Sequence, residues 1–546
     1  MFLGVDVGGT HTDAVLTDGQ KTLAAAKAPT QARVISSLNA VLSELLNGAD
    51  PKGIKRLTVS TTLGLNSVLT GTAPPVGIMV TGGPGLDLNP KDWGPLFREL
   101  PASQDHRGQV IKPLEYLTAL SSARELAQKA ETIVVASKFG PKNQTLEETM
   151  FKAALAAAPG PVMAASSLFG RLNFARRLGG TVLNGAVKKL YDLFLQDLEQ
   201  SVRERGLTCP VWILKADGGV MDITQAKEKP VLALAAGPAA SLLGLWALVS
   251  QNSRQSGRDE TEDILMIDMG GTSTDLAVFS QGPLLTPEGL TLAGRPTLVR
   301  GLLTHSLALG GDTDLEPRGE EIVPVPQRRG PALALAEGGD PERPPTLTDA
   351  LNVLGLADLG NKAVSEKAFE KIAPGRAQAK ASQAVEAVLA RLKEAKEEFI
   401  RALNRQPAYT ISEFLVDRQL KPTKAVILGG PARTMAPLVS QALGLPTEAP
   451  PEAATANALG AALARPTREA ELYADTAAGT MSIPTLNVSR EIPARYTLDE
   501  AKNDLLAAMG DEAVQITQAE IFNQVSDYGA SGRVIKVRAQ SRPGLI

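Results

Sequence analysis

Two short stretches of the sequence combine glycines, threonines and carboxylates in the same order. Residues 6–13 read Asp-Val-Gly-Gly-Thr-His-Thr-Asp and residues 268–275 read Asp-Met-Gly-Gly-Thr-Ser-Thr-Asp, so six of the eight positions are identical. Paired glycines let backbone N–H groups approach an anion closely, and hydroxyls add further donors. Both stretches therefore predict turns that bind phosphate oxygens, through Gly8, Gly9, Thr10, His11 and Thr12 in the first and Gly270, Gly271, Thr272, Ser273 and Thr274 in the second.

Each stretch begins and ends with an aspartate. Asp6 and Asp268 follow an apolar run and are the predicted catalytic and metal-binding pair, because Mg²⁺ prefers one or two carboxylates together with waters and phosphate. Asp13 and Asp275 are further catalytic candidates, although support of the turn by hydrogen bonds is the preferred interpretation. His11 offers a titratable group near the phosphates, but packing of its ring over the turn is the more common role of a lone histidine.

A third glycine pair occurs late in the chain. Gly429-Gly430 follows the apolar run 425–428 and precedes a predicted helix over 433–443. Backbone at such a strand–helix turn often meets a nucleotide base or ribose. One such turn is not specific, but after two phosphate turns it predicts the adenosine side of a nucleotide site.

Both phosphate stretches lie between apolar runs, at 2–5 and 14–16 for the first and at 264–267 and 276–279 for the second. An apolar run, a glycine turn and a second apolar run predict a β-hairpin. This pattern distinguishes both stretches from the Walker A loop and the dinucleotide turn, each of which opens a helix. Two matched hairpins predict two similar half-domains that face one cleft.

The composition of the 546 residues restricts the function classes. Lys and Arg number 56 and Asp and Glu number 59, a net charge of −3, so no basic field would attract a nucleic acid. Cys209 is the only cysteine and there are three histidines, which excludes an internal disulfide framework and leaves little for a histidine-rich metal site. The N-terminus lacks the basic region of a signal peptide. We therefore expect a cytoplasmic enzyme.

One window has the length of a membrane span. Residues 231–249 carry no charge, but Gly237-Pro238 stands near the middle, where proline would break a spanning helix. The window is instead predicted to form a buried strand over 231–235, a tight turn, and a helix with Pro238 in its first turn. No membrane association is expected.

The remaining elements follow from the apolar periodicity. Residues 314–346 are rich in proline and charge and predict a loop with one hairpin, before a helix that Thr348 or Asp349 caps near residue 350. Beyond residue 481 the pattern changes and predicts a small α+β appendage, with a helix over 498–508 and strands over 513–517 and 534–539. Other helices are predicted over 31–46, 186–205 and 377–403, and other strands over 133–136, 162–165 and 211–215.

The order of these motifs resembles the superfamily of ATPases that includes actin, the sugar kinases and Hsp70. Within it the chain is similar to the hydantoinase A/oxoprolinase family, to which GPAA at 237–240 and PTLTDALNVLG at 345–355 point in particular. The chain departs from the family pattern at His11, where an aromatic is usual, at Asp217, where asparagine is more usual, and in its short segment after about residue 470. The matching stretches are 5–15, 60–69, 217–221, 230–240, 268–275, 338–355 and 429–432.

The resemblance implies an α/β fold with two ribonuclease-H-like (actin-like) half-domains around a nucleotide cleft. We expect the N-terminal half at 1–165, the second half with the adenosine motif at 166–470, and a small α+β C-terminal domain at 471–546. For Asp349, capping of the helix and lining of the cleft are equal alternatives. The residues expected on the substrate side are Thr61, Thr62, Asn66, Asp217, Gly218, Gly219, Gly311 and Asp349.

The resemblance further implies an ATP- and Mg²⁺-dependent hydrolase. Phosphorylation of the carbonyl oxygen of a cyclic amide, such as 5-oxoproline or a hydantoin, would let the ring open. Family members often work with a B-type subunit, some are ATP-dependent carboxylase components, and a homo-oligomer is compatible with the sequence. The residues leave two alternatives open, a small-molecule kinase and a non-catalytic nucleotide sensor or assembly factor. The acceptor loops carry no motif, so the substrate and the need for a partner stay open.

Overall fold

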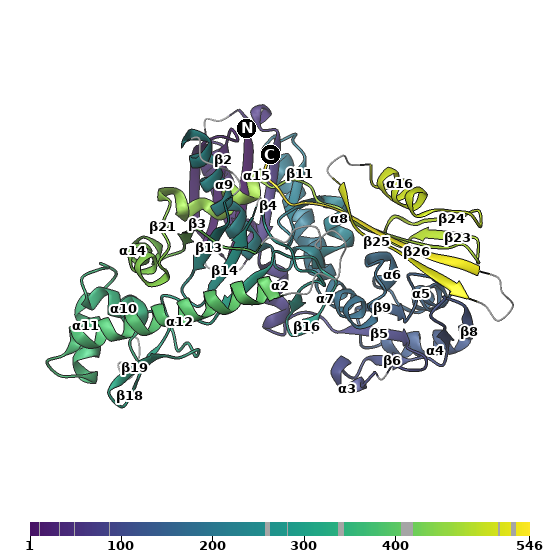
Figure 1. Cartoon of the computed structure of the whole chain (residues 1–546), viewed down its shortest axis with the longest axis horizontal. Coiled ribbons are helices and arrows are strands. Elements are labelled where there is room, and N and C mark those ends of the chain that lie inside the picture. Colours follow the sequence, from purple (N-terminus) through teal and green to yellow (C-terminus); the bar gives the residue numbers. More distant parts are fainter. Residues whose placement is uncertain are drawn as a thin grey trace.

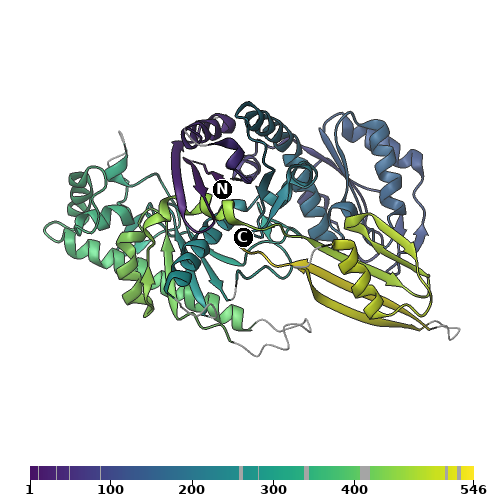
Figure 2. The same ribbon diagram turned by 90° about the horizontal axis from the view of Figure 1, so that it is seen from above.

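The structure is a computed structural model that describes residues 1–9, 11–31, 33–47, 50–86, 88–256, 262–280, 282–336, 343–405, 419–510, 514–525 and 531–546. Figures 1 and 2 show two central sheets beside each other, a group of helices that extends from one of them, and two further α/β units on the opposite side. The central sheets carry the two glycine stretches.

The first glycine stretch lies in a six-stranded sheet with the order β12-β11-β4-β1-β2-β3. β1, β2 and β3 form an antiparallel meander, and β4 and β11 run parallel to β1. The carboxyl ends of β1, β4 and β11 therefore meet at one edge of the sheet. The strands are β1 (Phe2–Val7), β2 (His11–Thr17), β3 (Thr22–Pro29), β4 (Arg56–Thr61), β11 (Val211–Leu214) and β12 (Val220–Asp222).

The second glycine stretch lies in a five-stranded sheet built on the same plan, with the order β17-β14-β13-β20-β21. β13 and β14 form the hairpin, and β20 runs parallel to β13 as β4 runs parallel to β1. The predicted pair of ribonuclease-H-like half-domains is confirmed by this repetition. The strands are β13 (Ile264–Met269), β14 (Thr274–Phe279), β17 (Thr304–Leu307), β20 (Lys424–Leu428) and β21 (Thr447–Glu448).

Two helices, α9 (Ala236–Ser256) and α15 (Ala456–Leu463), lie between the central sheets. They cross backbone to backbone, since a Cβ on Gly244 would lie 1.9 Å from the carbonyl oxygen of Ala456. Side chains of α9 and α15 share one apolar cluster with Val15 of the first sheet and Val426 of the second. The two half-domains are thus joined by a common core.

A four-stranded parallel sheet, β10-β9-β5-β6, is inserted into the first half. Helices α4 (Tyr116–Ala127) and α5 (Thr145–Ala157) cover one face, and α7 (Phe174–Glu204) leads back to the central sheet. The predicted strands over 133–136 and 162–165 are confirmed, whereas α7 begins well before the predicted residue 186. The strands are β5 (Val76–Thr81), β6 (Phe97–Glu99), β9 (Thr132–Ser137) and β10 (Val162–Ala164).

Helices dominate the rest of the second half. The predicted hairpin within 314–346 is β18 (Leu315–Arg318) and β19 (Glu321–Pro324), and the predicted helix over 377–403 is α12. These helices bury an apolar face against the second central sheet. They are α10 (Leu347–Val353), α11 (Lys362–Ile372), α12 (Ala377–Arg405) and α14 (Ala432–Leu443).

The C-terminal unit is an α+β layer with its own apolar core, as predicted. One helix, α16 (Leu498–Met509), covers a sheet with the order β24-β23-β22-β26-β25. Figure 2 shows this unit beside the inserted sheet, away from the helices of the second half. Its strands are β22 (Glu469–Asp475), β23 (Thr480–Ile483), β24 (Val488–Glu491), β25 (Val514–Val525) and β26 (Ser531–Ser541).

Two expectations about local structure are wrong. Residues 231–235 do not form a strand: η2 (Pro230–Ala233) is a 3-10 turn that begins at a proline, and α9 follows it with Pro238 in the first turn, as predicted. The cap of α10 is Thr346, in a reciprocal capping box with Asp349, so the helix begins three residues earlier than expected.

Strands β11 and β12 belong to the first central sheet although they follow residue 165. We therefore propose that the first half, with the inserted sheet inside it, extends through η2, because Val231 and Ala233 belong to its apolar core. We propose that the C-terminal unit begins at Thr467, because Arg468 already hydrogen-bonds with Ser541 of β26. Among the described residues, no helix combines the length and apolar character needed to cross a membrane.

Candidate active site

The two glycine turns close with the same hydrogen bond. The amide of Gly8 donates to the carbonyl oxygen of His11 at 3.0 Å, and that of Gly270 donates to Ser273 at 2.9 Å. Gly9, Gly271 and Thr272 are exposed at the turn tips, where their backbone is available to an anion. The predicted hairpins are thus confirmed, and Thr10 lies outside the described residues.

Thr12 and Thr274 are turned away from the tips. The hydroxyl of Thr12 lies 3.2 Å from that of Thr30, and the hydroxyl of Thr274 donates to the carbonyl oxygen of Leu309 at 2.5 Å. Both side chains are fully buried. These contacts hold each hairpin against the neighbouring segment of the chain. In this structure both threonines therefore support the hairpins, and their side chains do not face the turn tips where phosphate was expected.

The structure brings Asp6 and Asp268 close enough for their charges to interact. Asp6 Oδ2 accepts a hydrogen bond from Asn457 Nδ2 at 3.1 Å, and Asp268 accepts one from Ser241. Burial raises the pKa of Asp6 to about 6, and the carboxylates of Asp13 and Asp268 add to the rise. Burial likewise raises the pKa of Asp268.

Neither aspartate forms an ion pair with a basic side chain among the residues that the structure describes. Asp6 Oδ1 is buried without a partner in hydrogen-bonding geometry, although the Ser60 hydroxyl lies close enough to oppose the rise in pKa. A divalent cation that keeps most of its waters fits this pair of acids. Its charge would offset the cost of ionising them in a buried place, and Asp6 Oδ1 has no other partner in hydrogen-bonding geometry in the described chain. Within the described chain no group of three or more metal-ligand side chains offers an alternative.

Asp13 and Asp275 stand opposite Asp6 and Asp268 in the two hairpin registers. Asp13 forms an ion pair with Lys27 on β3 at 2.9 Å. Asp275 accepts a hydrogen bond from Ser306 on β17, and burial raises its pKa. Both contacts tie the hairpin to its next strand, which agrees with the preferred interpretation as hairpin support.

Glycines from two later segments pack onto the second hairpin. Gly311 donates its amide to the carbonyl oxygen of Gly270 at 2.9 Å. Gly429 has a φ of +101°, and a Cβ there would lie 1.8 Å from the carbonyl oxygen of Met269. Gly430 has open space around it. The structure therefore places the predicted adenosine turn directly beside the second phosphate turn.

Residues after β4 lie beside the first hairpin. The Thr61 hydroxyl accepts the amide of Leu63 at the start of α2 (Leu63–Leu69) at 3.1 Å, and Asn66 Nδ2 donates to Thr62 at 3.3 Å. A Cβ on Gly9 would lie 3.9 Å from Asn66, and one on Gly237 would lie 3.1 Å from Thr62. Thr62 and Asn66 thus join the first hairpin to the start of α9.

Asp349 is buried at the start of α10. Its side chain accepts hydrogen bonds from the amides of Leu333, Ala334 and Thr346 and from the Ser365 hydroxyl. With both oxygens engaged, Asp349 holds the chain that precedes α10 and completes the capping box of Thr346. Its expected place on the substrate side stays a prediction.

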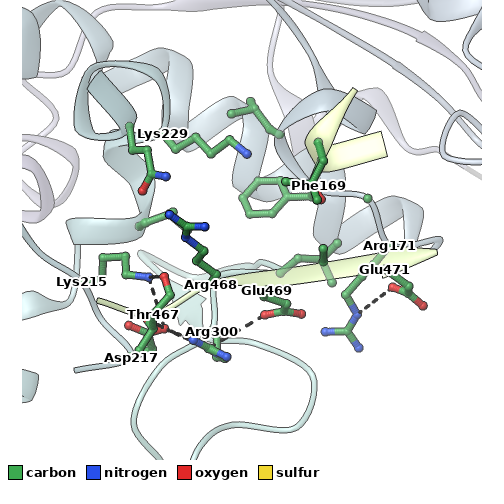
Figure 3. Close-up of a pocket in the computed structure, with 18 of the residues that line it drawn as sticks. Phe169, Arg171, Lys215, Asp217, Lys229, Arg300, Thr467, Arg468, Glu469 and Glu471 are labelled. Carbon is green, nitrogen blue, oxygen red and sulfur yellow. Dashed lines mark hydrogen bonds and ion pairs between the residues drawn. The ribbon is translucent and has the colours of Figure 1, made fainter. Parts of the chain in front are cut away.

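Asp217-Gly218-Gly219 follows β11, and Asp217 borders a cavity of about 420 Å³ between the first half and the C-terminal unit. Figure 3 shows Asp217 bonded to Lys215, Arg300 and Thr467 at one end of this cavity. Gly218 has a φ of +79°, and a Cβ on Gly219 would lie 1.9 Å from the Thr467 hydroxyl, so the pair permits a tight turn against the C-terminal unit.

Family models describe most of the chain. The hydantoinase/oxoprolinase N-terminal region matches residues 2–156, and the hydantoinase/oxoprolinase model matches residues 177–470. The second match alone covers more than half of the sequence. The chain belongs to the hydantoinase/oxoprolinase family. The resemblance predicted from the motifs is confirmed.

Two curated proteins resemble this hydantoinase/oxoprolinase chain. An uncharacterized protein of Methanocaldococcus jannaschii is 24% identical over 427 residues, which are 68% of this chain and 60% of that protein. The caprolactamase subunit alpha of Pseudomonas jessenii is 24% identical over 412 residues, which are 65% of this chain and 55% of that subunit. The aligned region thus spans less than two thirds of the length of either relative.

Two solved structures share the fold of this family member. The ATP-dependent caprolactamase of Pseudomonas jessenii gives a TM-score of 0.72 at 15% identity, over 99% of this chain and 87% of that one. Nucleotide-free acetone carboxylase, from work on ATP-dependent acetone carboxylation, gives 0.66 at 18% identity, over 100% and 87%. The likeness confirms the predicted α/β architecture.

Sequence patterns missed several polar residues of the cleft. Asn457 lies 451 positions from Asp6 and stands in an alanine-rich helix with no motif around it. Ser241 directly follows the GPAA stretch of the family and could have been found by its spacing of one turn from Gly237. Arg300, Lys229 and Arg468, which line the cavity near Asp217, lie in segments without any motif.

Proposed function

We propose that this chain uses ATP and Mg²⁺ to phosphorylate the carbonyl oxygen of a cyclic amide of the 5-oxoproline or hydantoin kind, so that the ring can open. One observation carries the proposal: the buried Asp6 and the partly buried Asp268 lie together, without a basic partner in the described chain, beside two matched glycine turns. The names of the similar proteins, ATP-dependent caprolactamase and acetone carboxylase, favour an ATP-dependent amide hydrolase or carboxylase.

Each residue has a distinct role in this proposal. Asp6 and Asp268 would hold Mg²⁺, which when bound neutralises charge on the transferring phosphate. The exposed amides at Gly9 and Gly271 would orient the phosphates, and Gly430 would face the adenosine. Thr62 and Asn66, beside the first turn, would position the acceptor. Phosphoryl transfer depends mainly on such positioning and charge stabilisation.

The alternatives differ in their product. A small-molecule kinase would release a phosphorylated acceptor, a carboxylase subunit would require bicarbonate, and a sensor would bind ATP without substrate-dependent turnover. Requirement for a second subunit is proposed from the alpha-subunit name of the Pseudomonas relative. A screen of cyclic amides, hydantoins and ketones, with and without bicarbonate, for phosphate release and product mass separates these outcomes.

The site itself is tested by Asp268→Asn. We expect loss of ATP turnover by at least about 100-fold, since removal of one transition-state charge partner commonly costs that much. The fold should persist, because the amide keeps the shape and removes a carboxylate that burial disfavours. Asp358→Asn, an exposed residue paired with Lys362, is the matched control. Full turnover by Asp268→Asn would refute the assignment.

A further inference from the structure

The cavity beside Asp217 is lined by both apolar and charged side chains. Phe169 and Leu168 come from the inserted segment, Leu232 and Leu298 from the first half and the loop before Arg300, and Met509 from the end of α16. Its volume of about 420 Å³ lies within the range of small-molecule sites. None of the glycine-turn residues borders it.

Most charges around the cavity neutralise one another. Asp217 is bonded to Arg300 and lies 3.6 Å from Lys215 Nζ. Glu469 accepts a hydrogen bond from Arg538 Nε at 2.9 Å, and Arg300 Nε lies 3.9 Å from its carboxylate. Glu471 lies 3.0 Å from Lys536 Nζ and 4.0 Å from Arg171 Nε. These three acids therefore leave no demand for a cationic ligand.

In the described chain, two cations of the cavity have no acid within ion-pair distance, and the charge of Glu228 acts on the neighbouring Lys229 only without such a pair. Lys229 is half-buried, and its ammonium makes no hydrogen bond or ion pair with the residues that the structure describes. Arg468 donates Nη1 to the carbonyl oxygen of Met509 at 2.9 Å but meets no carboxylate within ion-pair distance in the described chain. The one remaining acid, Glu228, is exposed at the rim. The cavity therefore keeps an excess of positive charge.

The unpaired groups face one space from two sides. Lys229 lies at the end of α8 (Ile223–Glu228) in the first half, whereas Arg468 directly precedes β22 of the C-terminal unit. Figure 3 shows both side chains directed into the cavity, with the ring of Phe169 across from Arg468. Lys229, which is half removed from water, gains most from a ligand that supplies negative charge, and the exposed Arg468 adds a second donor to the same ligand.

We propose that this cavity binds a small organic anion, with an acidic group held by Lys229 and Arg468 and an apolar body packed on Phe169 and Leu298. Carboxylates and phosphate monoesters share this chemistry. Because the two cations belong to different units, the ligand would also bind the C-terminal unit to the first half. This site goes beyond the proposed function and does not rest on it, since no nucleotide-site residue takes part.

Calorimetric titration without nucleotide tests the proposal. The probes are acetate, hexanoate and 3-phenylpropanoate, the matched neutral 3-phenylpropanamide, and 2-phenylethyl phosphate. We expect 3-phenylpropanoate or the phosphate ester, or both, to bind, and the neutral amide to bind at least about tenfold more weakly, because a charge-assisted hydrogen bond is lost. The preference between carboxylate and phosphate identifies the natural acidic group.

Lys229→Met and Arg468→Met should each weaken binding of the preferred anion about tenfold or more. Lys91→Met removes an exposed lysine elsewhere and should leave the affinity unchanged. If Lys229→Met fails to fold, the exposed Arg468 still provides the test. Equal binding of the acid and the amide, wild-type affinity in a folded variant, or no binding of any anion up to about 10 mM would overturn the proposal.

Discussion

Asp6 and Asp268 are carboxylates whose ionisation the fold disfavours. Each is at least partly removed from water and has no basic partner in the described chain. Asn457 and Ser241 stabilise their charged forms, but the pKa of both acids stays raised, so burial outweighs these hydrogen bonds. Such a pair costs stability in the free protein and recovers that cost when a cation binds.

The pH dependence of stability follows from Asp6. Its folded pKa of about 6 lies above the ordinary aspartate value of 3.8, so its proton is held more tightly in the folded state. Its contribution to folding stability is therefore fully present below about pH 3.8 and is lost as the pH rises through about 6. Asp6→Asn should raise metal-free stability at pH 7.5 by up to about 3 kcal/mol, measured by urea unfolding, and should gain nothing at pH 4.

The same measurement with Mg²⁺ and a non-hydrolysable ATP analogue completes this test. Ligand should stabilise the wild-type protein but not Asp6→Asn, because the variant lacks one of the two carboxylates. Asp358→Asn should behave as wild type under every condition, since its side chain is exposed and is paired with the exposed Lys362. A stability gain of Asp6→Asn at pH 4 equal to that at pH 7.5 would contradict the role of ionisation.

The acids of the cleft were predictable and their supporting residues were not. A repeated motif marks Asp6 and Asp268, because a hairpin turn needs its glycines close by in sequence. Asn457 reaches Asp6 only through the crossing of α15 over the first sheet, which no local pattern encodes. Thr12 and Thr274 were expected at the phosphates, but alternation along a strand turns them toward the interior.

At the scale of elements, the hairpins are positioned by close backbone contacts. Gly429 reaches the second hairpin at a distance that excludes a side chain, and Gly311 is joined to it by the hydrogen bond from its amide to Gly270. These glycines follow different segments, β17 and β20 (Lys424–Leu428), so the nucleotide site is assembled only when both segments lie against β13. In the sequence, this assembly is visible as glycines at the ends of the strands.

Gly429 and Gly430 are a matched pair for testing whether close backbone contact positions the second hairpin. Gly429→Ala should lower stability by at least about 1–3 kcal/mol, because φ is +101° and the added Cβ would overlap the carbonyl oxygen of Met269. Gly430→Ala should keep the stability within about 0.5 kcal/mol, because it has open space. Its effect should appear as a raised KM for ATP. Thermal unfolding and ATPase titration distinguish the two, and equal stability losses would refute the contact argument.

Elements with a clear apolar period were predicted well, and elements bounded by proline were not. The hairpins, α1 (Val34–Leu45) and α12 match their predicted ranges closely. The apolar run 231–235 has the composition of a buried strand, yet Pro230 and the GPAA stretch start a 3-10 turn and then a helix. Composition could not decide between the two because both bury the same side chains.

At the scale of the whole molecule, the C-terminal unit is joined to the first half through a buried ion pair. Arg300 donates to Asp217 and also to Gln540 and the carbonyl oxygen of Ser541 on β26. Burial opposes ionisation of Asp217, but Lys215 and Arg300 outweigh it and hold its pKa well below the usual range. This contact is therefore favourable only while Asp217 is charged.

Arg300→Met should lower stability by on the order of 3 kcal/mol at pH 7, because it leaves the buried carboxylate of Asp217 with Lys215, 3.6 Å away, as its one basic partner in the described chain. Since the folded pKa of Asp217 is depressed, the wild-type advantage is present above about pH 4 and is lost below it. Urea unfolding at pH 7 and pH 3 should therefore show a smaller difference at pH 3. Arg490→Met, which removes a more exposed pair with Asp504, should cost under about 1 kcal/mol.

The apolar layer that α9 and α15 share with both central sheets has a consequence for the unfolding of the molecule. The matched hairpins have the form of a duplicated module, and each copy has an apolar cluster of its own in addition to this shared layer. A fragment cut between them would expose one side of this layer to water. We therefore expect the two half-domains to unfold together as one cooperative body, whereas the C-terminal unit, which has an apolar core of its own, is expected to unfold separately.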